Sequence, residues 1–174
     1  KLDLERQRLQ LALREAKLIS SWSAPNEAYE KACREFLEQL LLSEKGRPLR
    51  DAIAAASRTI APSGALDSLV QTLLRMSVPG IPDLYQGAEY WDFSLVDPDN
   101  RRPVDYAARE RSLDARPAVS ELLESWHDGR IKQAMIQRTL EVRAAHPALF
   151  REGSYQKLDV LGAHADRIHA FARV

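Results

Sequence analysis

Residues 78–106 read VPGIPDLYQGAEYWDFSLVDPDNRRPVDY, and this stretch decides how the rest of the chain is interpreted. It is rich in Pro, Gly, aromatic rings and paired charges, and it lacks a helical period although helical patterns lie on both sides. Connections of this length are uncommon in compact domains and are usually functional or disordered. Because disordered segments are poor in aromatic residues, Tyr85, Tyr90 and Trp91 indicate order. We therefore predict an ordered loop that binds a ligand.

Amphipathic patterns on both sides of this loop predict helices. The expected helices cover residues 2–20, 25–46, 48–60, 65–77, 105–113, 117–127 and 129–146. Pro62 is expected to end the third of these helices and Pro147 the last, since proline cannot donate the hydrogen bond that continues a helix.

Two short β regions are also expected. Ile81 to Tyr85 is apolar, and its Pro82 is tolerated only at the start of a strand, so we predict a short strand near 83–86. The segments YQKLDVLG (155–162) and RIHAFARV (167–174) alternate with a period of two, which predicts a hairpin. The expected fold is therefore mainly α with a small β part.

Composition excludes several classes of protein. Lys plus Arg and Asp plus Glu both number 25, so no net charge draws the chain to nucleic acid or to a membrane surface. A single cysteine, Cys33, excludes disulfides and Cys-based zinc sites within the chain, and we expect a buried inert thiol. No apolar run approaches a membrane span, and no signal peptide is visible, which favours a cytoplasmic protein. The absence of an initial Met and the ending in a strand-like pattern suggest a piece of a longer protein.

The loop offers carboxylates and aromatic rings as candidate functional groups. Two carboxylates could act as general acid and nucleophile in glycosyl transfer. Alternatively, they cap turns or pair with Arg101 and Arg102. The candidate carboxylates are Asp83, Glu89, Asp92, Asp97, Asp99 and Asp105.

Trp22, Trp91 and Trp126 could each stack on a sugar ring. Core packing is favoured for Trp22 and Trp126, which adjoin helices, whereas both interpretations stay open for Trp91.

The sequence gives little support for a metal site or a cofactor site. The segment from Asp97 resembles the start of a calcium loop, but Arg102 stands where that loop requires Gly. No two of the four histidines pair at metal spacing on one helix face, and no phosphate-binding glycine loop or Ser-His-Asp arrangement is present. We therefore expect neither a metal nor a cofactor.

Several motifs resemble the alpha-amylase superfamily. The segment PGIPDLYQGAEYWDFSLVDPDNRRPVDY (79–106) is similar to the region around its eighth barrel strand, and RTLEVRAAHPALFREGSY (138–155) is similar to its last barrel helix. Within the superfamily, the sequence of the first segment resembles that of the maltooligosyl trehalose synthases. So do AKLISSWSAPNEAYE (16–30) and GALDSLVQTLLRMSVPG (64–80), and together the resemblance covers almost the entire chain.

The resemblance implies the closing segment of a (β/α)8 barrel followed by the start of a C-terminal β-sheet domain. Residues 1–150 would be the C-terminal part of the barrel domain, with its last strand near 83–86, and residues 151–174 would begin the β domain. A complete barrel takes about 250 residues, so the chain can supply only part of one.

The resemblance also implies a reaction. Such enzymes convert the reducing-end alpha-1,4 bond of a maltooligosaccharide into the alpha,alpha-1,1 bond of trehalose by intramolecular transglycosylation. Their catalytic carboxylates lie upstream of Lys1, so none is expected in this chain, and the isolated chain is expected to be inactive. The partners implied are the maltooligosaccharide and the N-terminal part of the same enzyme. The substrate-binding candidates are Tyr85, Gln86, Glu89, Trp91, Asp97, Asn100, Arg101 and Arg102.

Alternatives stay open at this point. Arg101 and Arg102 either contact sugar or brace the loop through Asp97 or Asp92. The chain could instead belong to another hydrolase or transglycosylase of the superfamily, or be a non-catalytic helical interaction module.

Overall fold

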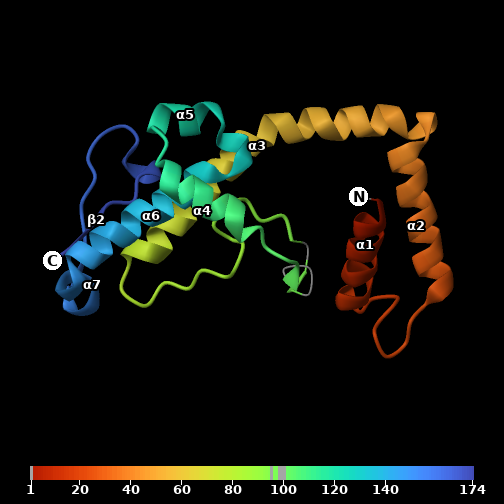
Figure 1. The fold of residues 1–174 in the computed structure, drawn as a ribbon, viewed down its shortest axis with the longest axis horizontal. Helices are drawn as coiled ribbons and strands as arrows, with labels where there is room; N and C mark the ends of the chain where they lie inside the picture. Colours follow the sequence, from red (N-terminus) through yellow and green to blue (C-terminus); the bar gives the residue numbers. More distant parts are fainter. Residues whose placement is uncertain (1, 95, 98–100) are drawn as a thin grey trace. The chain divides into compact units, whose positions relative to one another are not determined.

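The computed structural model describes residues 2–94, 96–97 and 101–174. The chain divides into two compact units. The first comprises Lys1–Gly64 and Asp92–Val104, and the second comprises Ala65–Trp91 and Asp105–Val174. Figure 1 follows the chain through them by colour. Each unit is described by itself.

Helices dominate both units, as the hydrophobic periodicity predicts. The described elements are α1 (Leu2–Ala16), α2 (Glu27–Leu42), η1 (Glu44–Gly46), α3 (Arg47–Ser77), α4 (Tyr106–Ala115), α5 (Val119–Glu124), η3 (Trp126–Asp128), α6 (Arg130–Ala145), α7 (Pro147–Glu152), β1 (Tyr155–Lys157), η4 (Ala165–Arg167) and β2 (Phe171–Arg173). The mainly α fold with a small β part is thus confirmed.

In the first unit, α1 and α2 run antiparallel, side by side (Figure 1). Arg6 Nε donates a hydrogen bond to Glu38 Oε1 at 2.8 Å, and Arg14 Nε donates one to Glu30 Oε1 at 2.8 Å. As the residue number rises on one helix it falls on the other, so these pairs fix the antiparallel register.

A buried carboxylate fixes the connection between these helices. Glu30 is only 2% exposed, and it accepts hydrogen bonds from Arg14, from the Ser20 hydroxyl and from Gln10. The Arg14 bonds, followed by the Ser20 bond, lower the pKa of Glu30 to about 2. Ser20 Oγ also accepts from the backbone N–H of Asn26 at 3.0 Å, and Asn26 in turn caps α2. The polar network therefore holds both ends of the connection.

Helix α3 continues through Pro62, where the sequence predicts a break. Proline removes one N–H donor from the helix, and Gly64, a poor helix former, follows two residues later. In a helix of 31 residues, the hydrogen bonds on either side keep the backbone helical. The prediction of two helices is therefore wrong. The boundary between the two units falls at Gly64, so the Pro-Gly signal coincides with a change of unit and not with a helix end.

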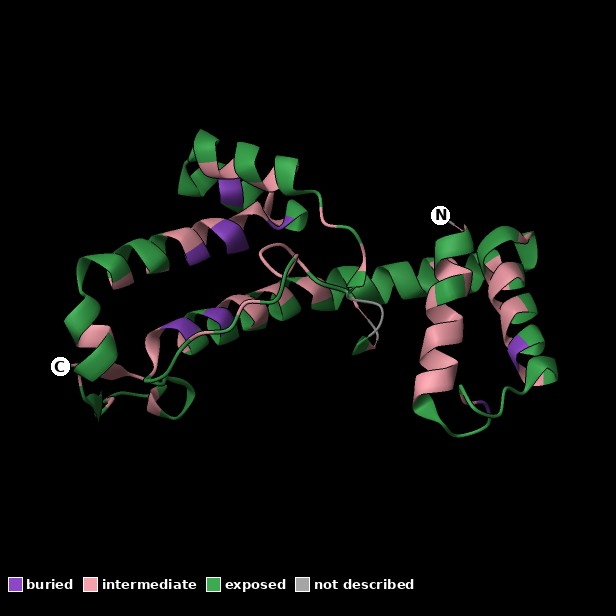
Figure 2. Cartoon of the chain, turned by 60° about the horizontal axis from the view of Figure 1, so that its bottom comes forward, coloured by how far each residue is buried: buried purple, intermediate pink, exposed green. Residues whose placement is uncertain are grey.

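The second unit has a small apolar core and a polar one beside it. Met76, Leu122 and Ile136 are at most 5% exposed, and α6 packs against α4, α5 and α7. Lys132 and Gln133 are buried on α6 as well. Figure 2 colours the buried positions of the chain purple. Buried polar groups require hydrogen-bond partners. Tyr90 O, in the segment before α4, lies 3.4 Å from Lys132 Nζ, and Arg109 O on α4 accepts from Gln133 Nε2.

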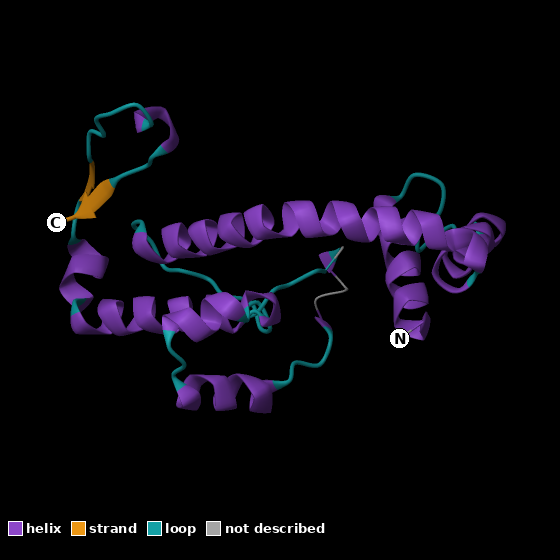
Figure 3. Cartoon of the chain, turned by 90° about the horizontal axis from the view of Figure 1, so that it is seen from above, coloured by secondary structure: helices purple, strands orange, loops and turns teal. Residues whose placement is uncertain are grey.

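The C-terminal hairpin is confirmed but shorter than predicted. Strands β1 and β2 pair antiparallel, with Tyr155 opposite Arg173 and Lys157 opposite Phe171 (Figure 3). The rings of Tyr155 and Phe171 stack with centroids 5.0 Å apart, which is a favourable cross-strand contact. Each strand keeps only three residues, because the intervening residues turn through η4.

Helix α6 ends at Ala145, just before Pro147, as the sequence predicts. Pro147 is also the first residue of α7, a position where its missing N–H costs nothing. The predicted strand near 83–86, in contrast, is wrong. Residues 83–86 do not form a strand: 83–85 are irregular and Gln86 opens a turn, in which Ala88 N–H donates to Tyr85 O at 3.0 Å. A strand needs a neighbouring strand, and the strands that the structure describes pair only with each other.

Candidate functional site

The first part of the predicted binding loop is attached to η3 and the start of α6. Trp91 Nε1 donates to Trp126 O at 2.8 Å, and the two indole rings meet edge to face with centroids 6.5 Å apart. Gly129 follows η3 with φ +84°, and a Cβ atom there would lie 2.8 Å from Trp91 N. Only glycine allows both this backbone conformation and this close approach. Trp91 is thus fixed by its neighbours.

Arg109 on α4 holds the same loop segment from the other side. Its Nε donates to Glu89 Oε2 at 2.9 Å, and its Nη2 donates to Gly87 O at 2.9 Å. Its guanidinium also lies over the Tyr90 ring, 4.5 Å from the centroid. These contacts use the fork of donors and the flat cationic face that only arginine combines. Arg109 therefore fixes the course of residues 87–90.

Helix α6 supplies further contacts to this arrangement. Gln133 Nε2 donates to Arg109 O at 3.1 Å, and Lys132 Nζ lies 3.4 Å from Tyr90 O. Both side chains are more than nine-tenths buried, which explains why α6 buries polar residues on this side.

The tip of this segment is more exposed. Tyr85 is 47% exposed, and Gln86 is exposed with its Oε1 accepting from Tyr106 Oη at 3.3 Å. The structure therefore brings four of the predicted substrate residues into one segment. Two of them, Tyr85 and Gln86, offer a ring and an amide to a ligand, whereas Glu89 and Trp91 are engaged within the protein.

The remaining predicted residues belong to the first unit and are described apart from these. Asp97 Oδ2 accepts from Arg101 Nη2 at 2.7 Å, with both side chains mainly exposed, and Arg102 Nη2 lies 3.4 Å from Ser94 Oγ. The bracing pair that the sequence offered for Arg101 is thus present. Asn100 and Asp99 lie outside the described residues.

The loop carboxylates mostly serve local structure. Asp92 accepts from the backbone N–H of Ser94 at 3.0 Å, and Asp105 caps α4 by accepting from Ala108 N at 2.9 Å. Together with the pairing of Glu89 and Asp97, this agrees with the alternative that these groups cap turns and pair with arginines.

Sequence reasoning missed Arg109, Lys132 and Gln133. Asp105 is a helix-cap residue type, and Arg109 follows it by four residues, which places Arg109 on the first turns of α4, next to the loop that precedes the helix. This spacing was the available signal for Arg109. Lys132 and Gln133 carried none, because polar residues on a helix are normally exposed.

Trp22 and Cys33 are both more exposed than the sequence predicts. Trp22 is half exposed, with its Nε1 donating to Glu15 at 2.8 Å, so its predicted core packing is wrong. It lies in an irregular connection between α1 and α2, with the Arg14 guanidinium 5.1 Å from its ring centroid. Cys33 is partly exposed and not buried as expected. Among the described residues, no cluster of His, Cys, Asp or Glu could hold a metal ion, and no helix there is long and apolar enough to cross a membrane.

Comparison with known proteins gives a consistent set of relatives. No protein-family model matches the chain. A Mycobacterium tuberculosis protein named as a maltooligosyl trehalose synthase is 36% identical over 93% of this chain and 19% of its own length. The structure of maltooligosyltrehalose synthase from Arthrobacter ramosus matches with a TM-score of 0.76 and 33% identity, over 97% of this chain and 22% of that one.

A crystal structure of a further maltooligosyl trehalose synthase matches with a TM-score of 0.74 and 28% identity, over 99% of this chain and 23% of that one. The chain therefore spans about a fifth of the length of the relatives it matches. The resemblance that the sequence motifs indicated is confirmed by both sequence and fold.

Proposed function

We propose that this chain, which matches one segment of maltooligosyl trehalose synthases over nearly its whole length, supplies the corresponding segment of such an enzyme. The enzyme would convert the reducing-end alpha-1,4 linkage of a maltooligosaccharide into an alpha,alpha-1,1 linkage. The carrying observation is the extent of the match, at 36% identity over 93% of the chain, which includes the loop fixed by Arg109.

The proposal places residues 83–91 at the rim of a (β/α)8 barrel, where active sites of this fold form. The domain boundary near residue 150, with a β-sheet domain beginning at 151, stays a prediction.

Within this proposal the loop residues bind and position substrate. Tyr85 offers an exposed ring for stacking on a glucosyl residue, and Gln86 offers an amide to its hydroxyls. Asp97, Asn100, Arg101 and Arg102 are proposed as further contacts to sugar hydroxyls. Glu89 and Trp91 would act mainly by holding the segment in place, since their polar atoms are engaged by Arg109 and by Trp126 O.

The bond exchange itself requires other residues. Retaining glycosyl transfer uses one carboxylate as nucleophile and a second carboxyl as acid and base. Glu89 Oε2 accepts from Arg109 Nε at 2.9 Å, so this carboxylate is engaged in holding the loop. We therefore propose that the catalytic carboxylates come from the remaining part of the enzyme, and that the 174 residues alone are inactive. No cofactor is proposed, and the cytoplasmic location stays a prediction.

The test is product analysis with maltopentaose and the full-length protein that contains this segment. The proposal expects a non-reducing product with a trehalosyl end, seen as loss of reducing ends without a gain in glucose. Release of glucose or maltose as the main product would instead identify a hydrolase of the same superfamily. The 174-residue chain, assayed in parallel, is expected to give neither product.

A further inference from the structure

The part of helix α3 that belongs to the first unit carries an apolar stripe along one side. Its members follow one another at intervals of four, three and four residues, which places them on one face of the helix. They are Leu49, Ile53, Ala56 and Ile60. All ten residues 51–60 are exposed, and Ile53 and Ile60 are 53% and 68% exposed. Within the described part of the chain, no element therefore covers this stripe.

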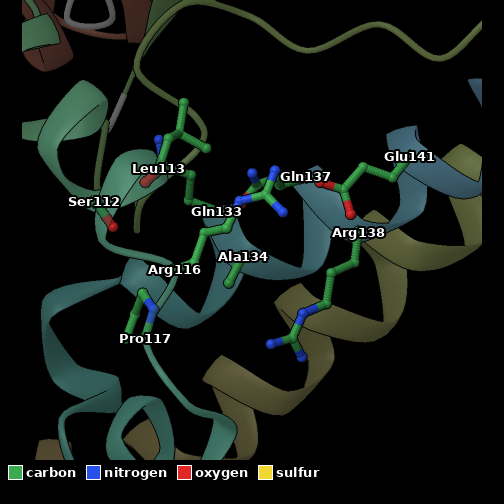
Figure 4. Close-up of a pocket in the computed structure, with 9 residues that line it drawn as sticks. All are labelled: Ser112, Leu113, Arg116, Pro117, Gln133, Ala134, Gln137, Arg138 and Glu141. Atoms are coloured by element: carbon green, nitrogen blue, oxygen red, sulfur yellow. Dashed lines mark hydrogen bonds and ion pairs between the residues drawn. The ribbon is translucent and has the colours of Figure 1, made fainter.

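Helices α4 and α6 of the second unit, in contrast, cover each other. They pack together and leave a cavity of about 130 Å3 between them (Figure 4). Such packing matters, because most helical stability in proteins comes from burial of an amphipathic face and little comes from propensity. Residues 51–60 of α3 are helical throughout without it, so a partner that buries the α3 stripe is expected.

The spacing of the α3 stripe indicates what kind of partner fits. Intervals of four and three residues are those of the a and d positions in a coiled coil, where each helix meets another helix. Ala56, in the middle of the stripe, has a small side chain and allows the partner helix to come close. The charged residues Asp51 and Arg58 lie on the opposite side of α3. The surface therefore suits an apolar helix face.

The orientation of α3 at this end is fixed by its own unit. Arg50 Nη1 donates to Leu40 O at 2.6 Å and to Ser43 O at 2.9 Å, at the C-terminal end of α2. Arg50 lies about a quarter of a turn away from Leu49, so these bonds use another side of the helix. The α3 stripe is thus held in place and stays open to a partner.

The length of the α3 stripe decides between a second copy of the chain and a segment of the same polypeptide. From Leu49 to Ile60 it spans about 17 Å, whereas coiled-coil pairing is typical of about three to four heptads or more. A surface of this length and one helix wide also falls short of the about 1,200 Å2 that stable interfaces between separate molecules bury. A covalently linked segment needs less area, because the link gives it a high effective concentration.

We propose that the α3 stripe is the docking surface for a helix of the same polypeptide that lies outside residues 1–174. This inference rests on the proposed function, because the chain spans only about a fifth of the relatives it matches, and the remaining length provides the partner segment. The docked helix buries the stripe with an apolar face of its own.

Site-specific photo-crosslinking in the full-length protein tests the contact directly. The crosslinker p-benzoylphenylalanine is placed at the position of Ile60 on the stripe and, as the matched control, at the position of Arg58 on the opposite side of the same exposed stretch. We expect the Ile60 position to join a peptide of the same molecule outside residues 1–174, in several times the yield found at Arg58. Leu49 is the second crosslinking position, should the protein with the crosslinker at Ile60 fail to fold.

A pair of matched substitutions gives an independent measurement. Ala56→Glu and Ala54→Glu make the same change at exposed positions on the two sides of the helix. If an apolar helix covers the stripe, only Ala56→Glu buries a charge without a partner. We therefore expect the melting temperature of the full-length protein to fall by about 2 °C or more in Ala56→Glu and to change by less than about 1 °C in Ala54→Glu.

The other outcomes contradict the proposal. A crosslink between two molecules would assign the stripe to a second copy, and equal yields at Ile60 and Arg58, or equal shifts in the two glutamate variants, would show a solvated face. Failure of this inference is distinct from failure of the proposed function. A protein that forms the trehalosyl product without the crosslink refutes only the docking surface, and one that crosslinks but releases glucose refutes only the proposed function.

Discussion

Arg109 Nε on helix α4 donates a hydrogen bond to Glu89 Oε2 at 2.9 Å, across a loop of sixteen intervening residues and the first turn of the helix. The same guanidinium bonds Gly87 O and covers the Tyr90 ring. One side chain thus determines the path of the segment proposed to meet substrate. With side chains 15% and 26% exposed, the pair is screened less than a surface ion pair.

Replacing this arginine should loosen the loop. We expect Arg109→Gln to lower the free energy of unfolding by about 2 kcal/mol, because Glu89 and Gly87 O lose charge-assisted hydrogen bonds. Arg109→Lys should recover part of the loss by keeping the charge beside Glu89, though not the fork to Gly87. Urea denaturation of the protein measures both changes.

Arg111→Gln is the matched control, since Arg111 lies on the same helix and is exposed. In the full-length protein, Arg109→Gln should also raise the share of maltopentaose that is hydrolysed, because a loosened rim admits water. A variant that keeps both the stability and the product ratio of the wild type would show that Arg109 does not position the loop.

Gly129→Ala should be more damaging than its small size suggests. Gly129 has φ +84°, and a Cβ there would lie 2.8 Å from Trp91 N and 2.9 Å from Tyr90 Cβ. Gly162→Ala is the control, because it has φ +117° with open space around the added Cβ. We expect backbone strain of about 1–3 kcal/mol in both variants, and an additional loss with a shifted tryptophan fluorescence spectrum only in Gly129→Ala. Equal losses with unchanged spectra would contradict the close packing of this loop.

The sequence predicted elements wherever the pattern was local. The apolar periodicity of α1 and α2, and the alternation in the hairpin, need no distant partner to be recognised. Pro62 shows the limit of such rules, because a helix of 31 residues tolerates one missing hydrogen bond. Residues 83–86 show another, because strand formation depends on neighbouring strands that the described residues do not provide.

The sequence indicated order in residues 85–91 but not the contacts that hold them. Aromatic residues and carboxylates marked the loop, since they are unusual in a disordered connection. Glu89 is engaged by Arg109, and Trp91 is engaged by Trp126 O. Both partners lie far from the loop residues in sequence, and they decide which loop side chains remain available to a ligand. Such contacts follow from tertiary packing, and no spacing rule within the loop reveals them.

The Glu30 network should make the first unit sensitive to acid. The pKa of Glu30 is lowered to about 2, whereas an unfolded glutamate titrates near pH 4.3. Its contribution to stability is therefore present above about pH 5 and is lost as the pH falls toward 2. We expect Glu30→Gln to remove part of the pH dependence of the unfolding midpoint between pH 5 and 3. Glu35→Gln, which changes an exposed residue of the same helix, should leave that dependence intact. Parallel curves for wild type and Glu30→Gln would contradict the assignment.

Arg101 allows loop bracing and substrate contact to be separated. Its ion pair with Asp97 is 2.7 Å long, yet the side chains are 67% and 73% exposed, and such pairs contribute about 0–1 kcal/mol to stability. If Arg101 contacts sugar, as we propose, Arg101→Lys should change the free energy of unfolding by less than about 1 kcal/mol. It should nevertheless raise KM for maltopentaose by about fivefold, because lysine cannot form two parallel hydrogen bonds. Arg47→Lys is the control at another exposed pair, and it should leave KM unchanged. Steady-state kinetics and denaturation of the full-length variants check this together: a loss of stability without a change in KM would assign Arg101 to bracing alone.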